Sequence, residues 1–159
     1  MPAISRMRSL FVLPIMLTAI LSAMFVTSTP QASAATASQR IGTAVGVALN
    51  QVGDPYRYGA AGPNAFDCSG LVYYSYRKAG FSRIPRTSSA QANFARHIRK
   101  ANMRRGDLMF FFDGGGVYHA AIFLRWDHGR AWMLDAPQSG EKVHAHFAWT
   151  TQWFGRTLR

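Results

Sequence analysis

Cysteine is almost absent from this sequence, because Cys68 is the only one among 159 residues. The N-terminal segment has the features of an export signal, and exported proteins that use cysteine structurally carry an even set that can pair. Cys68 has no partner for a disulfide. No cysteine directly follows the apolar N-terminal run either, which excludes lipid modification there. Nucleophilic chemistry is the simplest use for the remaining thiol.

Long apolar runs are also lacking beyond the N-terminus. Arg6 and Arg8 precede an apolar run from Leu10 to about Val26, and the small residues at 32–34 match a signal-peptidase pattern. The alternative is an uncleaved anchor, but a membrane helix needs about 20 apolar residues, and this run is shorter and contains Pro14. We expect a signal peptide over residues 1–34, a flexible leader over 35–39, one domain over 40–159, and no stable membrane anchor.

Acidic residues are scarce, since 7 Asp and Glu stand against 18 Lys and Arg, for a formal net charge of +11. This balance favours anionic surroundings, here wall polymers or phospholipid head groups. The alternative is that the charge serves only solubility. The basic residues are scattered and are not interleaved with aromatic residues in a stacking pattern, so we expect no binding to nucleic acid.

The two halves of the remaining chain differ in pattern, and together they are long enough for one domain. Apolar residues recur at helical spacing over 41–52 and 69–79, and a shorter helix is expected from about Ser88 to Phe94. The second half has short segments rich in β-branched or aromatic residues, at 107–112, 120–126, 131–134 and 142–147. His128-Gly129-Arg130 is a hairpin signal between two of them. We predict an α+β fold with N-terminal helices packed on an antiparallel sheet.

Cys68 lies in the string Asp67-Cys68-Ser69-Gly70, at the expected start of a helix. The unpaired N–H groups and the positive end of the helix dipole lower a thiol pKa there from its usual value of about 8.5. The same N–H groups can stabilise an oxyanion when an acyl group is attacked. The position therefore suits a thiolate nucleophile.

Five histidines could assist such a thiolate. His97 lies in a basic stretch expected to be helical and His128 in a turn, so both are expected to be solvated. His144 and His146 alternate on a late strand and are expected to share one face, but a metal site would need further ligands that the sequence does not supply. His119 follows a glycine-rich loop and opens an apolar strand, where it can face another element across the core. The alternative for His119 is a buried histidine with a structural role.

Five segments, in order, resemble the NlpC/P60 family of cell-wall cysteine peptidases. They are Gly53–Gly59, Phe66–Val72, Pro85–Gln91, Arg105–Phe111 and Tyr118–Leu124. Asp-Cys-Ser-Gly alone would be weak, whereas the ordered set is specific and covers most of the domain. The resemblance implies a papain-like α+β fold and hydrolysis of peptidoglycan stem peptides, commonly between D-glutamate and the following diamino acid.

The resemblance also implies roles for single residues. Cys68 matches the nucleophile, His119 the general base, and Tyr56 a tyrosine that can hydrogen-bond near the oxyanion. The third polar residue of the family lies on the next strand and is usually a histidine, but the matching string here contains Asp135. A carboxylate there would orient the imidazole and stabilise its charged form. The alternative for Asp135 is a turn-forming residue.

Substrate-binding positions follow in the same way. Asp67 and Ser69 match positions that bind a free N-terminal amine and the neighbouring backbone. Residues 86–89, with Ser88 among them, are expected to line the groove. Arg86 is a candidate partner for a substrate carboxylate, and the alternative is an ordinary surface arginine.

The sequence therefore predicts a secreted monomeric cysteine endopeptidase that acts in the cell wall or periplasm through an acyl-enzyme at Cys68. No metal or organic cofactor is expected, and anionic wall polymers could attract the basic chain. Three alternatives stay open: an N-acetylmuramoyl-L-alanine amidase, an acyl transferase on the same scaffold, and a wall-binding module without catalysis.

Overall fold

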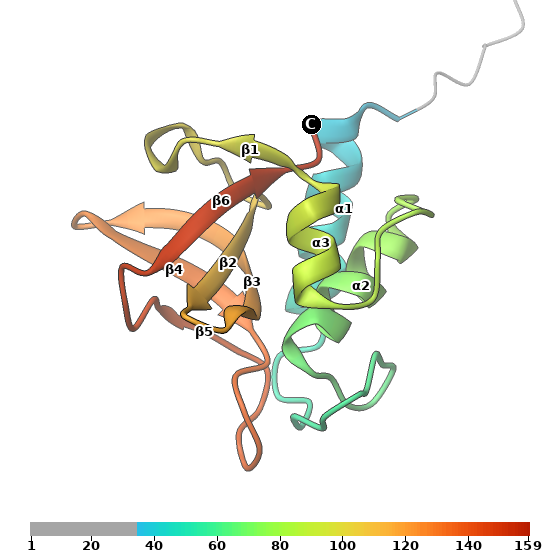
Figure 1. Ribbon diagram of the computed structural model, residues 1–159. Coiled ribbons are helices and arrows are strands. Elements are labelled where there is room, and N and C mark those ends of the chain that lie inside the picture. The colour runs from blue at the N-terminus through green and yellow to red at the C-terminus, as the bar shows by residue number, and fades with distance from the viewer. Residues whose placement is uncertain (1–34) are drawn as a thin grey trace, which may run out of the picture. The chain divides into compact units, whose positions relative to one another are not determined.

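Helices come first along the described chain and pack on one face of a six-stranded antiparallel sheet (Figure 1). The computed structural model describes residues 35–159. The helices are α1 (Ala37–Leu49), α2 (Cys68–Lys78) and α3 (Ser88–Phe94), with a 3₁₀ turn η1 (Lys100–Asn102). The strands are β1 (Arg96–Ile98), β2 (Leu108–Asp113), β3 (Gly116–Asp127), β4 (Arg130–Asp135), β5 (His144–Phe147) and β6 (Trp153–Thr157). The predicted α+β, papain-like arrangement is confirmed.

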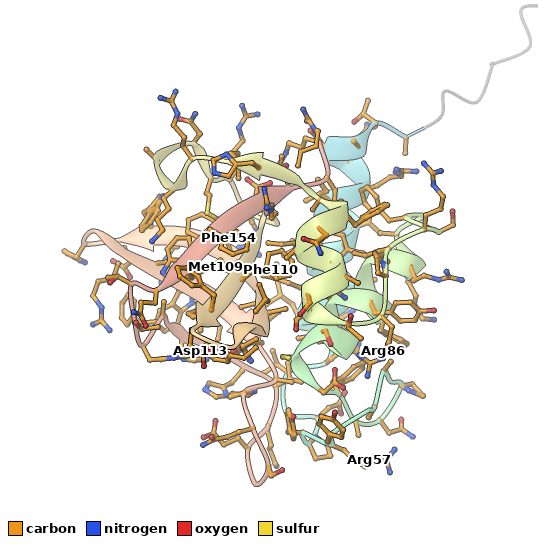
Figure 2. The ribbon with its side chains drawn as sticks, in the orientation of Figure 1. Arg57, Arg86, Met109, Phe110, Asp113 and Phe154 are labelled. Carbon is orange, nitrogen blue, oxygen red and sulfur yellow. The ribbon has the colours of Figure 1, made fainter. Side chains whose placement is uncertain are left out.

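The sheet has the order β1-β6-β2-β3-β4-β5, and its strands β2, β3 and β4 present alternate residues to two apolar clusters. On β2, Phe110 belongs to the cluster shared with the helices, whereas Met109 and Phe111 belong to the cluster on the other face. Figure 2 labels Met109 and Phe110. Both faces of the central strands are therefore buried. Such burial keeps rigid the strands that carry the candidate site.

The expected hairpin between β3 and β4 is present. His128 and Gly129 both adopt positive φ, at 48° and 75°, which suits the tight turn that matches the twist of paired strands. The helix predicted over 41–52 ends earlier, at Leu49, and Val52 is 52% exposed.

Two strands were not predicted, and they lie side by side. Strand β6 pairs with β2, and β1 pairs with β6 at the edge of the sheet. The assignment of His97 to a helix was wrong, because His97 lies on β1. β1 has only three residues, two of them polar, and β6 contains Gly155, where a Cβ atom would lie 2.7 Å from the sulfur of Met103. Neither segment has the apolar alternation that identifies a strand.

The flexible leader expected over 35–39 is wrong for its last three residues, because α1 begins at Ala37. Thr36 caps the helix through a reciprocal pair of hydrogen bonds with Gln39, at 2.7 and 3.2 Å. This capping box overrides a composition of small residues that otherwise favours a flexible chain. The signal peptide expected over 1–34 lies outside the described residues. Among residues 35–159, no helix is long and apolar enough to cross a membrane.

Candidate active site

The nucleophile candidate, Cys68, is the first residue of α2, and Asp67 caps the helix before it. The Asp67 carboxylate accepts hydrogen bonds from the Gly70 N–H at 2.6 Å and from the Ser69 hydroxyl at 3.2 Å. A Cβ atom at Gly70 would lie 2.0 Å from the carbonyl oxygen of Ala60, so only glycine fits there. The backbone N–H groups of Cys68 and Ser69, at the start of this turn, have no partner within the helix and remain available to an oxyanion beside the thiol.

Arg86 also binds the Asp67 carboxylate. Its guanidinium donates to both oxygens of the Asp67 carboxylate, at 2.6 and 2.9 Å, and also to the Ser69 hydroxyl and the Ala60 carbonyl. Figure 2 shows Arg86 near the first turn of α2. Burial works against the Asp67 charge, but the hydrogen bonds from Arg86 and the backbone lower the carboxyl pKa. Arg86 is thus an internal partner here, and its contact with a substrate carboxylate stays a prediction.

Gln91 on α3 ties the same turn to the neighbouring helix. Its side-chain amide is fully buried and donates to the carbonyl oxygens of Ser69 and Pro85, both at 2.9 Å. The loop that carries Arg86 is therefore fixed against the start of α2.

His119 lies on β3 and faces the thiol across the core, as expected. Its Nε2 atom lies 2.6 Å from Oδ2 of Asp135, the last residue of β4. The other oxygen, Oδ1, accepts a hydrogen bond at 2.8 Å from Nε2 of His146 on β5. His119 is 5% exposed and Asp135 is fully buried. The predicted third residue is thus beside His119, together with a second histidine whose part in the site the sequence did not reveal.

Cys68 and His119 each stabilise the charged form of the other. Burial disfavours the imidazolium, but the hydrogen bonds of His119 to Asp135 and Cys68 raise its pKa to about 9. Burial would raise the pKa of the Cys68 thiol, yet the hydrogen bond and the charge of His119 bring it below the usual value. Both shifts favour the pair of a thiolate and an imidazolium, which is the reactive form of such a thiol.

Trp149, in the loop before β6, covers this group and was also missed. Its ring stacks on Phe111 at 4.4 Å between centroids, meets the His119 ring edge to face at 5.1 Å, and lies parallel to the His146 ring at 5.9 Å. Nothing in the neighbouring sequence marks this tryptophan, because its contacts with Phe111 and His119 come from strands distant along the chain.

Two hollows meet at Cys68. The first, of about 680 Å³, contains the thiol and imidazole and is also lined by Pro137, Gln138, Glu141, His144, His146 and Trp149. The second, of about 440 Å³, lies on the side of Arg86 and is lined by the predicted substrate-binding residues Asp67, Ser69, Arg86 and Ser88. Tyr56, Cys68 and Tyr118 line both. Burial, together with the nearby Cys68 and Asp67 charges, raises the pKa of Tyr56, so its hydroxyl keeps its proton as a donor.

His144 and His146 share one face of β5 as predicted, with ring centroids 4.4 Å apart. His144 contacts the carbonyl oxygen of Lys142, and His146 contacts Asp135. In the part of the chain that the structure describes, no cluster of three or more His, Cys, Asp or Glu side chains is arranged to hold a metal ion.

Known proteins are similar to this chain in sequence and in fold. The probable endopeptidase Cgl2188 of Corynebacterium glutamicum is 42% identical over 121 residues, which are 76% of this chain and 54% of that protein. The peptidoglycan endopeptidase RipA of Mycobacterium tuberculosis is 40% identical over 108 residues, covering 60% of this chain and 22% of RipA. The chain thus spans about half, or less, of these curated relatives.

Solved structures of RipB and RipA are similar to this chain in fold. The peptidoglycan hydrolase RipB of M. tuberculosis has a TM-score of 0.65 at 32% identity, over 77% of this chain and 66% of RipB. Structures of RipA mutated at a histidine, a cysteine or a glutamate have TM-scores of 0.64, 0.63 and 0.63 at 31% identity, over 76% of this chain and 62% or 63% of RipA. Residues 53–159 match the sequence model of the NlpC/P60 family. The chain therefore belongs to the NlpC/P60 family.

Proposed function

We propose that this protein is a cysteine endopeptidase that hydrolyses peptidoglycan stem peptides. The observation that carries the proposal is a thiol at a helix N-terminus facing an imidazole that a buried carboxylate holds at 2.6 Å. The relatives named as peptidoglycan endopeptidases or hydrolases support the substrate. RipA has been solved with mutations at a cysteine, a histidine and a glutamate, which are the same three kinds of group as Cys68, His119 and Asp135.

The reaction follows from the ion pair. The Cys68 thiolate attacks the carbonyl carbon of the scissile amide, and the N–H groups of the first turn of α2, with the Tyr56 hydroxyl, stabilise the oxyanion. His119 gives its proton to the departing amine as the C–N bond breaks, which leaves a thioester. His119 then takes a proton from water, the resulting nucleophile attacks the thioester, and the acid product and the thiolate are released.

The position of His119 supports an assignment of the two hollows to the two parts of the substrate. The amine must leave on the side where the imidazole can protonate it, and His119 lines the first hollow only. The acyl part of the substrate then occupies the second hollow, beside Asp67 and Arg86. The leaving residue occupies the first.

The position of Glu141 favours the bond between D-glutamate and a diamino acid as the bond that is cleaved. It is the one carboxylate among the described residues that line the first hollow, and Gln138 donates to it at 2.9 Å. A leaving diamino acid carries a side-chain ammonium, which a carboxylate at this place can bind. The sequence as a whole has an excess of positive charge, so a carboxylate there is a specific feature.

The place of action and the partners belong to the same proposal. The protein acts outside the cytoplasmic membrane as a monomer on wall peptides, and its net charge of +11 favours contact with anionic wall polymers.

Digestion of purified peptidoglycan by the protein, followed by mass spectrometry of the released fragments, tests the proposal. Fragments cut after D-glutamate, present with the native protein and absent with Cys68→Ala, are the expected result. Cleavage between muramic acid and L-alanine would instead identify an amidase. Binding to the wall that survives Cys68→Ala, with no fragments from several wall types, would identify a binding module.

A further inference from the structure

His146 lies outside the residues that the resemblance assigns, yet it shares the carboxylate that orients His119. Asp135 lies opposite His144 across the β4–β5 pair, and His146 is two residues further along β5 on the same face. Side chains at this diagonal offset reach each other across an antiparallel pair. The result is a continuous chain of contacts from the thiol through His119 and Asp135 to His146.

The orientation of the Asp135 carboxylate depends on its hydrogen bonds with both histidines. Its side chain is fully buried, and among residues 35–159 the Oδ1 atom has a single side-chain hydrogen-bond partner, the Nε2 atom of His146. A carboxylate held at one oxygen only can rotate about its Cβ–Cγ bond, and the second oxygen would stay buried without a partner. Such a group costs about a factor of 10 to 100 in an equilibrium constant.

The His146 ring is itself fixed in orientation. Trp149 lies parallel to it, with 9° between the ring planes, and the side chain is only 26% exposed. Trp149 also contacts the His119 ring edge to face. One tryptophan thus holds both imidazoles in the planes that direct their Nε2 atoms toward Asp135.

We propose that His146 is a positioning residue of the active site, which fixes the Asp135 carboxylate so that its other oxygen holds His119 toward Cys68. No proton leaves His146 in the cycle, because its Nε2–H donates to Oδ1 throughout. The inference rests on the proposed function only in taking Cys68 as the nucleophile.

A positive charge on His146 also balances the net charge of the titratable groups around it. Charged or titratable groups face its ring from four elements: Asp135 of β4, His119 of β3, His144 of β5, and Cys68 of α2, with Glu141 and Tyr56 in the loops around the same hollow. A thiolate, an imidazolium and a carboxylate sum to one negative charge. A protonated His146 neutralises it, and the hydrogen bond to Asp135 raises the pKa of His146 in that direction.

The test compares His146→Leu with His146→Gln, which keeps a donor but no charge, and uses His97→Ala on the exposed edge strand as control. Two quantities are measured for each: the alkylation rate of Cys68 by iodoacetamide as a function of pH, and kcat and KM on a stem peptide. Alkylation needs no substrate recognition, so it reports on the thiol whether or not the proposed substrate is correct. Thermal unfolding confirms that each variant is folded.

We expect His146→Leu to lower kcat about 10- to 100-fold with little change in KM, and to move the alkylation midpoint to higher pH, because the Asp135 carboxylate then holds His119 less firmly beside the thiolate that it stabilises. His146→Gln should recover most of kcat, and His97→Ala should match the native protein. Native alkylation and kcat in folded His146→Leu would overturn the inference. Equal losses of kcat in folded His146→Leu and folded His146→Gln would also overturn it. A shifted alkylation curve without any peptide cleavage would support the inference and reject the proposed substrate.

Discussion

The two hollows that meet at Cys68 are built differently. On the side of Arg86, which we propose to hold the acyl part of the substrate (the acyl side), Asp67 and Arg86 form a two-pronged ion pair whose remaining hydrogen bonds go to backbone and hydroxyl groups of the same region. On the side of His119, which we propose to hold the leaving residue (the leaving side), a buried carboxylate joins two imidazoles under an aromatic cover. The acyl side contains an ion pair that stays in place during the proposed reaction. The leaving side contains the proton of His119, which is transferred in that reaction.

This difference separates two kinds of contribution to the reaction. Groups on the acyl side set the place of the helix terminus and hence the stability of the site. Groups on the leaving side set the proton affinity of His119 and hence the rate of the chemical step. Changes in the two hollows should therefore appear in different measurements.

The largest effect is expected from Asp135→Asn. The amide can no longer stabilise the His119 imidazolium, so kcat should fall about 1000-fold while KM changes little. The alkaline limit of activity, set by a His119 pKa of about 9, should move to lower pH because the stabilising negative charge is gone. Steady-state kinetics over pH 5–10 (roughly the range in which these groups titrate) check this. Asp113→Asn, which changes an exposed carboxylate, is the control. Activity of Asp135→Asn above half of the native value would contradict the prediction.

Arg86→Ala should lower the free energy of unfolding, with a smaller effect on the rate of proton transfer by His119. Breaking the pair leaves a mostly buried carboxylate, at a cost of about 2 kcal/mol in the free energy of unfolding. Because folding lowers the pKa of Asp67, the pair stabilises the protein above the unfolded value of about 3.9. That contribution is lost as the pH falls through the folded pKa.

Denaturant unfolding of the native protein and Arg86→Ala, at pH 7 and at successively lower pH, measures this difference. It should be constant near neutrality and shrink below about pH 4. Arg83→Ala, an exposed neighbour, should be neutral. A constant difference down to about pH 2 would show that the charge pair is not its source.

Trp149→Ala tests the aromatic cover. Water would reach the hydrogen bonds of Asp135 and weaken them, so kcat should fall about tenfold, with a smaller change in the free energy of unfolding. Trp126→Ala removes a similarly exposed tryptophan that lines neither hollow and serves as control. Equal kinetic losses in both variants would mean that the cover has no specific role.

The smallest effect is expected from Glu141→Gln, because this carboxylate is partly solvated. KM should rise about fivefold for a stem peptide whose leaving residue has a free side-chain amine, with kcat unchanged. Acetylation of that amine should remove the difference between the variant and the native protein. A difference that persists with the acetylated peptide would exclude recognition of the ammonium.

Much of the acyl side could be predicted because it is local in sequence. Asp67, Cys68, Ser69 and Gly70 form one helix start, and helix capping depends on neighbours within four residues. Their roles in binding substrate remain predictions. The roles of Arg86 and Gln91 were less visible, since both act through contacts made after α3 packs beside α2.

The leaving side was predicted less completely. Asp135 was found by matching one strand to the family pattern, and His119 by its place at the start of an apolar strand. His146 and Trp149 were not found, because their partners lie on β4, β3 and β2. The edge strands β1 and β6 were missed for a related reason, since their short polar or glycine-containing sequences become strands only by pairing.

By itself, the sequence determined the α+β class, the helix that begins at Cys68, and the imidazole that faces it, because those features depend on periodicity, capping and motif order. Only the tertiary structure decided that Asp135 bridges two histidines, that Trp149 covers them, and that Arg86 is engaged by Asp67. The physical reason is that register and packing bring these groups together across strands and helices. Their hydrogen bonds have no signature at any fixed spacing along the chain.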